Sequence, residues 1–96
     1  MQASDPLTRC LHLKIRGRVQ GIGYRWFVQQ TAQRLQIEGW VRNLPDGSVE
    51  AQAQGPAEPL SSFIEELKNG HPYARVESVD RQEIAPRALD GIFAIR

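Results

Sequence analysis

Hydrophobic residues recur at every second position in some segments of the chain and at every third or fourth position in others, and the two patterns alternate along the sequence. This alternation constrains the fold more than any other feature, because the first spacing is typical of a strand and the second of a helix. Residues 11–16 (LHLKIR) alternate apolar and polar side chains, which predicts a half-buried strand whose apolar residues face the core. From Tyr24 to Leu35 a mainly apolar stripe recurs at i, i+3, i+4, i+7, i+8 and i+11, the spacing of one helix face. We therefore expect a strand followed by a helix.

The middle of the chain predicts a β-hairpin. Residues 38–43 (EGWVRN) and 48–54 (SVEAQAQ) flank LPDG. Proline presets one turn dihedral, and Asp46-Gly47 tolerates the reversal of the chain.

A second helix and two further strands follow the hairpin. Pro59 is expected to open the helix, apolar residues from Leu60 to Leu67 share one face, and Asn69-Gly70 is the expected stop. Residues 74–84 and 91–96 predict two strands. The alternation is less regular around Val76 and Val79, which indicates a β-bulge.

The resulting order is β-α-β-β-α-β with a short strand appended. We predict an α+β fold, a ferredoxin-like sandwich in which an antiparallel sheet carries both helices on one face. Metal carriers, RNA binders, regulatory modules and enzymes all use this plan, so the fold does not decide the function.

Composition restricts the class of protein. At 96 residues we expect one domain, and 41% hydrophobic with 24% charged residues is typical of soluble globular proteins. No apolar run is long enough to span a membrane, and Met1 to Arg9 lacks the apolar centre of a secretory signal, so we expect a cytoplasmic protein. The single cysteine, Cys10, has no neighbours at metal-ligand spacing, and we interpret it as structural or incidental.

The connection between the first strand and the first helix, GRVQGIGYR, combines glycines with arginines. Glycines there let consecutive backbone N–H groups turn toward an oxyanion, and the helix N-terminus adds partial positive charge. Arg25 lies off the apolar stripe, so its guanidinium can point back over the loop. A tight corner without a ligand is the simpler alternative.

Other nucleotide and nucleic-acid signatures fit this stretch poorly. It has no G-K-[ST], and its glycines have the wrong spacing for G-x-G-x-x-G. Residues 23–28 (GYRWFV) resemble an aromatic RNA-recognition signature, but that signature belongs on a strand and these residues open a helix. A net charge of +1 also disfavours general nucleic-acid binding, although residues 6–37 hold six basic residues and no acid.

Two motifs in the same order resemble those of acylphosphatases. GRVQGIGYR resembles the family signature G-x-V-Q-G-V-x-[FY]-R, and GWVRNLPDGSVEAQAQGP resembles a second block, G-W-V-x-N-x-x-D-G-x-V followed by G-P. The resemblance covers residues 10–96, the expected domain, and leaves residues 1–9 as an N-terminal tail that we expect to be flexible. Ile22 replaces the usual valine, and Tyr24 stands where phenylalanine is common.

The resemblance implies an acylphosphatase that hydrolyses small acyl phosphates to a carboxylate and inorganic phosphate, without cofactor or metal. By motif position, Arg25 and Asn43 correspond to the catalytic arginine and asparagine. The phosphate-binding loop corresponds to Gln20, Gly21, Ile22, Gly23, Tyr24 and Arg25.

Chemistry then favours direct attack by water oriented by Asn43, with its proton passing to a phosphate oxygen and no phosphoenzyme. Asp46, Ser48 and Glu50 are better explained by the hairpin, and His12 and His71 by the surface.

Two alternatives remain: a non-catalytic anion- or RNA-binding module on the same fold, and an accessory domain of the kind fused to hydrogenase-maturation enzymes. Against them we expect a free-standing monomer that binds neither nucleic acid nor membrane.

Overall fold

The computed structural model describes residues 8–88 and 90–96. Its elements follow the predicted order, with two helices and five strands. They are β1 (Thr8–Arg18), α1 (Tyr24–Arg34), β2 (Glu38–Asn43), β3 (Val49–Pro56), α2 (Ala57–Asn69), β4 (Arg75–Ile84) and β5 (Phe93–Ile95). The ferredoxin-like α+β prediction is confirmed.

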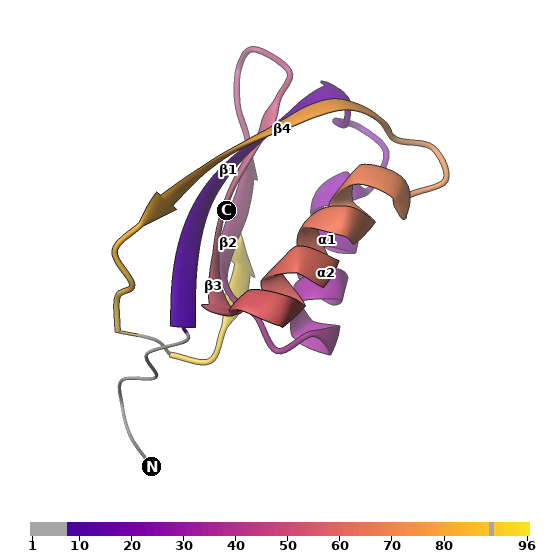
Figure 1. The fold of residues 1–96 in the computed structure, drawn as a ribbon. Helices are drawn as coiled ribbons and strands as arrows, with labels where there is room; N and C mark the ends of the chain where they lie inside the picture. Colours follow the sequence, from indigo (N-terminus) through magenta and orange to yellow (C-terminus); the bar gives the residue numbers. More distant parts are fainter. Residues whose placement is uncertain (1–7, 89) are drawn as a thin grey trace.

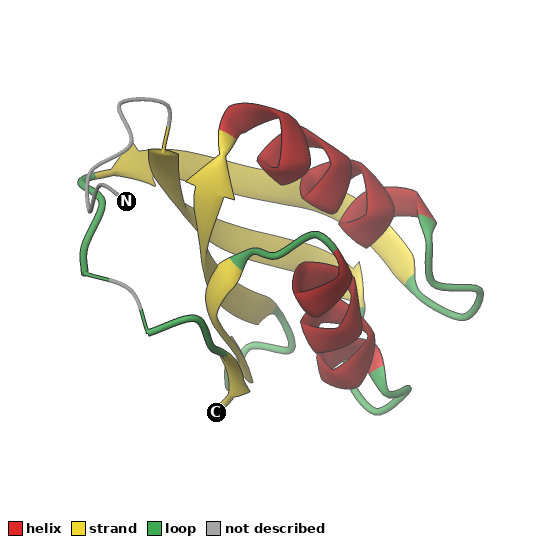
Figure 2. Ribbon diagram, turned by 90° about the horizontal axis from the view of Figure 1, so that it is seen from below, coloured by secondary structure: helices red, strands yellow, loops and turns green. Residues whose placement is uncertain are grey.

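One sheet carries both helices on the same face, as Figures 1 and 2 show. The strand order is β4-β1-β3-β2-β5, and the pairs β4 with β1, β1 with β3 and β3 with β2 are antiparallel. β5 pairs parallel with β2, so the sheet is mixed, whereas we expected an antiparallel one. The parallel pairing arises because the chain crosses from β4 at one edge of the sheet to the opposite edge before β5 begins.

The core lies between the sheet and the helices. The apolar side chains of the first strand, Leu11, Leu13 and Ile15, are buried there as their alternation predicted. Each helix adds one buried face, which includes Val28 from α1 and Phe63 from α2. The two helices are thereby fixed on the sheet, and the chain segment before α1 is fixed with them.

Several boundaries differ from the sequence prediction. α2 begins at Ala57, before Pro59, because proline is tolerated anywhere in a first turn, where its missing N–H would have no partner. β1 begins at Thr8, so Thr8 and Arg9 of the expected tail belong to the sheet, and residues 1–7 lie outside the described residues. The expected bulge is present: the register skips Glu77, between Val76 and Ser78.

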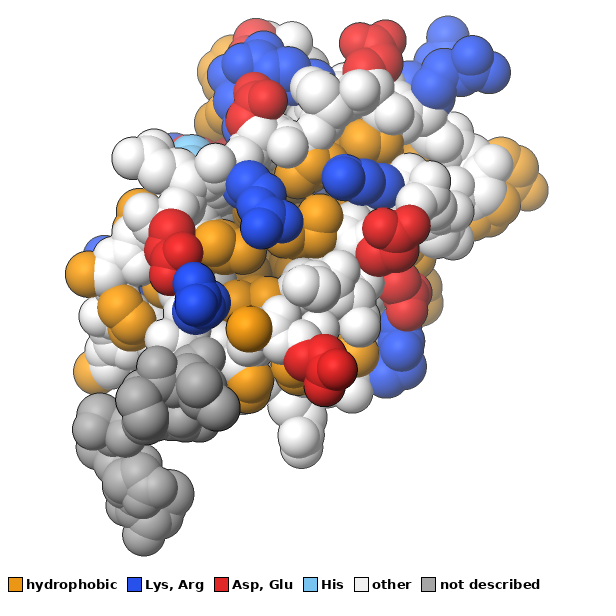
Figure 3. Space-filling view, viewed as in Figure 1, with side chains coloured by type: hydrophobic (Ala, Val, Ile, Leu, Met, Phe, Trp, Pro, Cys, Tyr) orange, Lys and Arg blue, Asp and Glu red, His pale blue; other side chains and the backbone are white. Residues whose placement is uncertain are grey.

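The helices of the described residues are too short and too polar to cross a membrane. Figure 3 shows Lys and Arg side chains interspersed with Asp and Glu on the face that it presents. Basic and acidic residues from distant parts of the chain form ion pairs, for example Arg9 with Glu83 at 3.1 Å and Arg16 with Asp80 at 3.0 Å.

Candidate active site

A cavity of about 210 Å³ lies where the β1–α1 loop meets the end of β2. It brings together Arg25 and Asn43, the two residues that the sequence motifs single out. The residues that line it are Val19, Gly21, Gly23, Tyr24, Arg25, Trp26, Asn43 and Ile95. The site thus draws on two strands, one loop and the first turn of a helix.

The loop before α1 has the backbone conformation that its glycines predicted. Gly21 has φ 79° and Gly23 has φ 74°, in the left-handed region that other residues rarely adopt. A Cβ at either position would meet nothing within 4 Å, so the conformation, not lack of space, requires glycine there. Gly23 is also the N-cap of α1, where free N–H groups and the helix dipole favour an anion.

Arg25 lies in the first turn of α1 and is half-buried. Its Nη1 donates a hydrogen bond to the backbone oxygen of Arg96 at 3.2 Å. Unlike Arg9, Arg16 and Arg34, which each pair with a carboxylate, Arg25 pairs with no Asp or Glu side chain of the described residues. No Asp or Glu side chain within residues 8–88 and 90–96 therefore neutralises its charge.

The end of β2 directs Asn43 into the cavity. Residues two apart in a strand point to the same face, so Asn43 shares the face of the buried Val41, which is the face that the helices cover. Its backbone pairs with Val49 at the start of β3, and its side chain is exposed to solvent. A neutral amide at this place can accept and donate hydrogen bonds without taking up a proton.

Side chains of the loop are used by the protein itself. Gln20 Nε2 donates to the carbonyl oxygens of Leu44 at 2.9 Å and Ser48 at 2.8 Å, which ties the loop to the β2–β3 turn. The Ile22 side chain packs against the core. The backbone of Gly21 and Gly23, which lines the cavity, is left to face an anion.

Tyr24 is buried, and its hydroxyl donates to the carbonyl of Leu67 at the end of α2, 2.7 Å away. Burial raises the pKa of this phenol, so it stays neutral and anchors α1 to α2. Its side chain is therefore a support of the loop, although the residue borders the cavity.

The acids of the hairpin are also occupied, as the sequence suggested. Asp46 accepts hydrogen bonds from the backbone N–H and the hydroxyl of Ser48, which lower the pKa of its carboxyl together with the nearby Lys14 ammonium. Glu50 lies between His12 and Arg42 on the helix-free face of the sheet. Within the described part of the chain, no three His, Cys, Asp or Glu side chains lie close enough to hold a metal ion.

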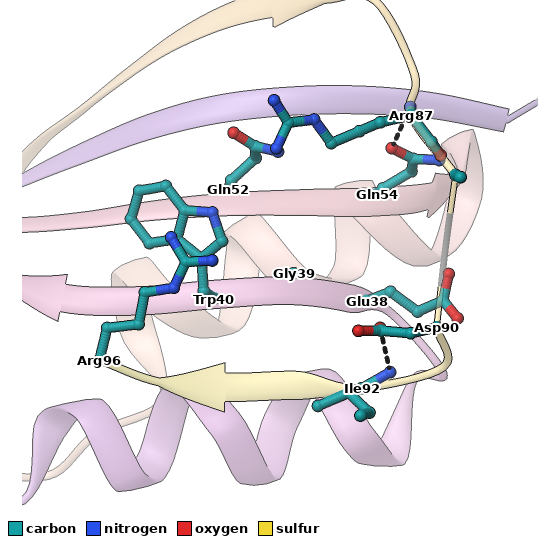
Figure 4. A pocket seen from close by; sticks show the side chains of 10 residues that line it. Glu38, Gly39, Trp40, Gln52, Gln54, Arg87, Asp90, Ile92 and Arg96 are labelled. Atoms are coloured by element: carbon teal, nitrogen blue, oxygen red, sulfur yellow. Dashed lines mark hydrogen bonds between the residues drawn. The ribbon is translucent and has the colours of Figure 1, made fainter.

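A second cavity, of about 350 Å³, lies on the helix-free face of the sheet and shares no lining residue with the first (Figure 4). The Arg96 guanidinium stacks 4.7 Å from the centre of the Trp40 ring. Gln54 and the backbone of Arg87 exchange two hydrogen bonds, of 2.8 and 3.0 Å. We could not predict this cavity from the sequence, because the residues that line it come together only when the segment between β4 and β5 crosses the sheet.

A family model, curated relatives and solved structures each include acylphosphatases. The family model described as Acylphosphatase matches residues 11–95. An acylphosphatase of Thermococcus kodakarensis is 46% identical over 80 residues, which are 83% of this chain and 88% of that protein. A solved acylphosphatase from Coxiella burnetii superposes with a TM-score of 0.91 at 34% identity, over the whole of both chains. The acylphosphatase of Bacillus subtilis gives a TM-score of 0.82 at 41% identity, over 92% of this chain and 98% of that one.

Proposed function

The chain belongs to the acylphosphatase family and has acylphosphatase activity, and we propose that Arg25, Asn43 and the amides of residues 20–25 carry out the reaction. One observation carries this proposal: Arg25, Asn43 and the two left-handed glycines line the same cavity. The substrate class that follows from the family is an acyl phosphate, and the product is inorganic phosphate.

The loop and Arg25 would hold the phosphoryl group. Its charge is spread over three equatorial oxygens in the transition state, so several fixed donors are needed. Backbone N–H groups before α1 supply some of them, and the planar guanidinium of Arg25 supplies paired donors in addition. Because such donors are oriented before the substrate binds, they stabilise the transition state at little reorganisation cost.

Asn43 would orient the attacking water. The water oxygen forms a bond to phosphorus while the bond between phosphorus and the acyl oxygen breaks, and the carboxylate leaves with that electron pair. A proton of the water passes to a phosphate oxygen of the substrate. The residues that line the cavity include no Asp, Glu, His, Ser or Cys, which supports direct attack by water over a phosphoenzyme.

Some expectations about the protein as a whole stay predictions. These are a domain at residues 10–96, a monomeric state, a cytoplasmic location and the lack of nucleic-acid binding.

Hydrolysis of benzoyl phosphate in the presence of EDTA, with a phosphate monoester as the control substrate, tests the proposal. Arg25→Lys should lose nearly all activity while staying folded, because one ammonium cannot replace paired donors. Loss of one preorganised donor costs roughly 10²- to 10³-fold in kcat. Arg34→Lys, an exposed arginine of the same helix, is the matched control. Near-normal turnover of Arg25→Lys would refute the role of Arg25.

Asn43→Ala separates water positioning from phosphate binding. We expect a lower kcat and an unchanged inhibition constant for inorganic phosphate, because the loop and Arg25 remain. A variant that no longer binds phosphate would place Asn43 among the phosphate ligands instead.

A further inference from the structure

His71 connects two loops that are far apart in the sequence. It lies between α2 and β4, yet its Nε2 is 3.1 Å from the carbonyl oxygen of Ile22, in the loop before α1. From the sequence we expected His71 on the surface, without a functional role. The structure shows a half-buried side chain in contact with the candidate phosphate-binding loop.

The hydrogen bonds of the ring determine where its proton lies. The backbone N–H groups of Tyr73 and Ala74 both point at Nδ1, at 3.1 and 3.2 Å. An N–H can only donate, so Nδ1 must accept, and the neutral ring then carries its proton on Nε2. His71 therefore donates to the carbonyl of Ile22.

Aromatic neighbours hold the imidazole in this orientation. The ring of Phe27 stands perpendicular to it with 5.3 Å between the ring centres, and the Tyr24 ring lies 5.9 Å away. Tyr73 packs from the side of the α2–β4 loop at 6.1 Å. Because the ring is held on both sides, the direction of its Nε2–H is fixed relative to α1.

Fixing the Ile22 carbonyl fixes the next amide as well. The peptide unit is planar and trans, so its C=O and its N–H point in opposite directions. When the Ile22 oxygen points to His71, the N–H of Gly23 points away from His71. Gly23 lines the cavity and has no side chain that could restrict rotation of the Ile22–Gly23 peptide, so the packed side chain of Ile22 and the hydrogen bond from His71 have to restrict it.

We propose that His71 is a positioning residue, which holds the Ile22–Gly23 peptide so that the Gly23 N–H faces the phosphoryl group. The inference rests on the proposed phosphate-binding function of this loop. His71 itself touches neither the substrate nor the reacting atoms. It acts by keeping one donor of the loop oriented before the substrate arrives.

Two substitutions separate this role from a local structural one. His71→Asn keeps an acceptor at the place of Nδ1 for the Tyr73 and Ala74 amides, and it lacks the donor that reaches Ile22. His71→Gln keeps a donor at the place of Nε2 and lacks the acceptor. The matched control is His12→Asn, on β1, where the histidine pairs with Glu50.

We expect the Asn variant to weaken inhibition by inorganic phosphate and to lower kcat/KM for benzoyl phosphate, each roughly fivefold, the size of one hydrogen bond. The Gln variant should keep most of both, and His12→Asn should change neither. In ¹⁵N spectra, phosphate should shift the Gly23 amide of the wild type strongly and that of the Asn variant weakly. Thermal unfolding reports separately on the fold.

The reverse ranking, with phosphate binding normal in the Asn variant and impaired in the Gln variant, would overturn the proposal. A spectrum of the wild-type imidazole that places the proton on Nδ1 would also overturn it, whether or not the variants fold. If the wild type hydrolyses benzoyl phosphate and His71→Asn has the same phosphate inhibition and kcat/KM, the role of His71 is refuted and the proposed function stands. A wild type that neither binds phosphate nor turns over substrate would refute the proposed function with it.

Discussion

Gln20 is the residue through which the two halves of the candidate site are joined, and replacing it by methionine tests that connection. Its Nε2 donates to the carbonyls of Leu44 and Ser48, at 2.9 and 2.8 Å, just after Asn43. Methionine has a similar length and no donor, so the substitution removes both bonds and keeps most of the volume.

The expected loss of stability follows from what the two carbonyls retain. The Leu44 oxygen also accepts from the N–H of Gly47 at 3.1 Å, and the Ser48 oxygen from the N–H of Leu44 at 2.9 Å. Neither is left without a partner, so the cost is that of two ordinary bonds, about 2 kcal/mol in total. In a domain of this size that lowers Tm by roughly 8–16 °C.

Activity should fall beyond what the loss of stability explains. The hairpin keeps its own turn bonds, so Asn43 stays on β2 while its distance from the loop is no longer fixed. We expect kcat for benzoyl phosphate to fall about tenfold or more at a temperature where the variant is folded, because small misplacements of positioning groups are costly.

Urea unfolding, thermal unfolding and steady-state kinetics check these expectations, with Gln33→Met as the control at an exposed position of α1. A destabilised variant with unchanged kcat would show that Gln20 supports the fold only. Unchanged stability would refute the reasoning about the hydrogen bonds.

Two further substitutions have separable outcomes. The hydrogen bond from His12, and after it the contact with Arg42, lower the pKa of Glu50 in the folded protein. Ionised Glu50 therefore stabilises the fold at pH values above its unfolded-state pKa of about 4.3, and this stabilisation is lost as pH falls through the lower folded-state pKa. In urea unfolding, the free energy of unfolding of Glu50→Gln should therefore fall less steeply between about pH 5 and 3 than that of the wild type. The same slope in both proteins would contradict this. Trp26, 63% exposed, lines the cavity, so Trp26→Ala should raise KM several-fold for benzoyl phosphate and little for acetyl phosphate. An equal change in KM for the two substrates would refute a contact between Trp26 and the acyl group.

The fold was predictable because hydrophobic period and turn chemistry are local properties. The alternation of residues 11–16 and the helical stripe from Tyr24 determine which faces are buried, and both patterns are complete within one element. The parallel pairing of β5 was not predictable in the same way. After four strands have paired, both β4 and β2 have an open edge, and no residue of a three-residue strand encodes which of the two edges β5 joins.

The charges near the site show the same limit. In the sequence, residues 6–37 are basic without a single acid. In the fold, acids from later elements pair with Arg9, Lys14, Arg16 and Arg34. Of the six basic residues, Arg18 and Arg25 have no carboxylate partner among the described residues, and of these two only Arg25 lines the cavity. Only long-range pairing decides which cation remains available for a ligand.

In the loop before α1, the backbone conformation could be predicted from the motif, but the contacts of the side chains could not. Its glycines could be interpreted locally, because left-handed backbone is a property of each residue. Three of its side chains have partners elsewhere in the fold: Gln20 contacts the hairpin, Ile22 the core and Tyr24 the end of α2. A loop that presents backbone to a ligand must hold its side chains elsewhere, so the orientation of its amides depends on the surrounding elements. Substitutions at Gln20 and His71, which contact the loop from two sides, should therefore impair catalysis without removing any atom that faces the phosphate.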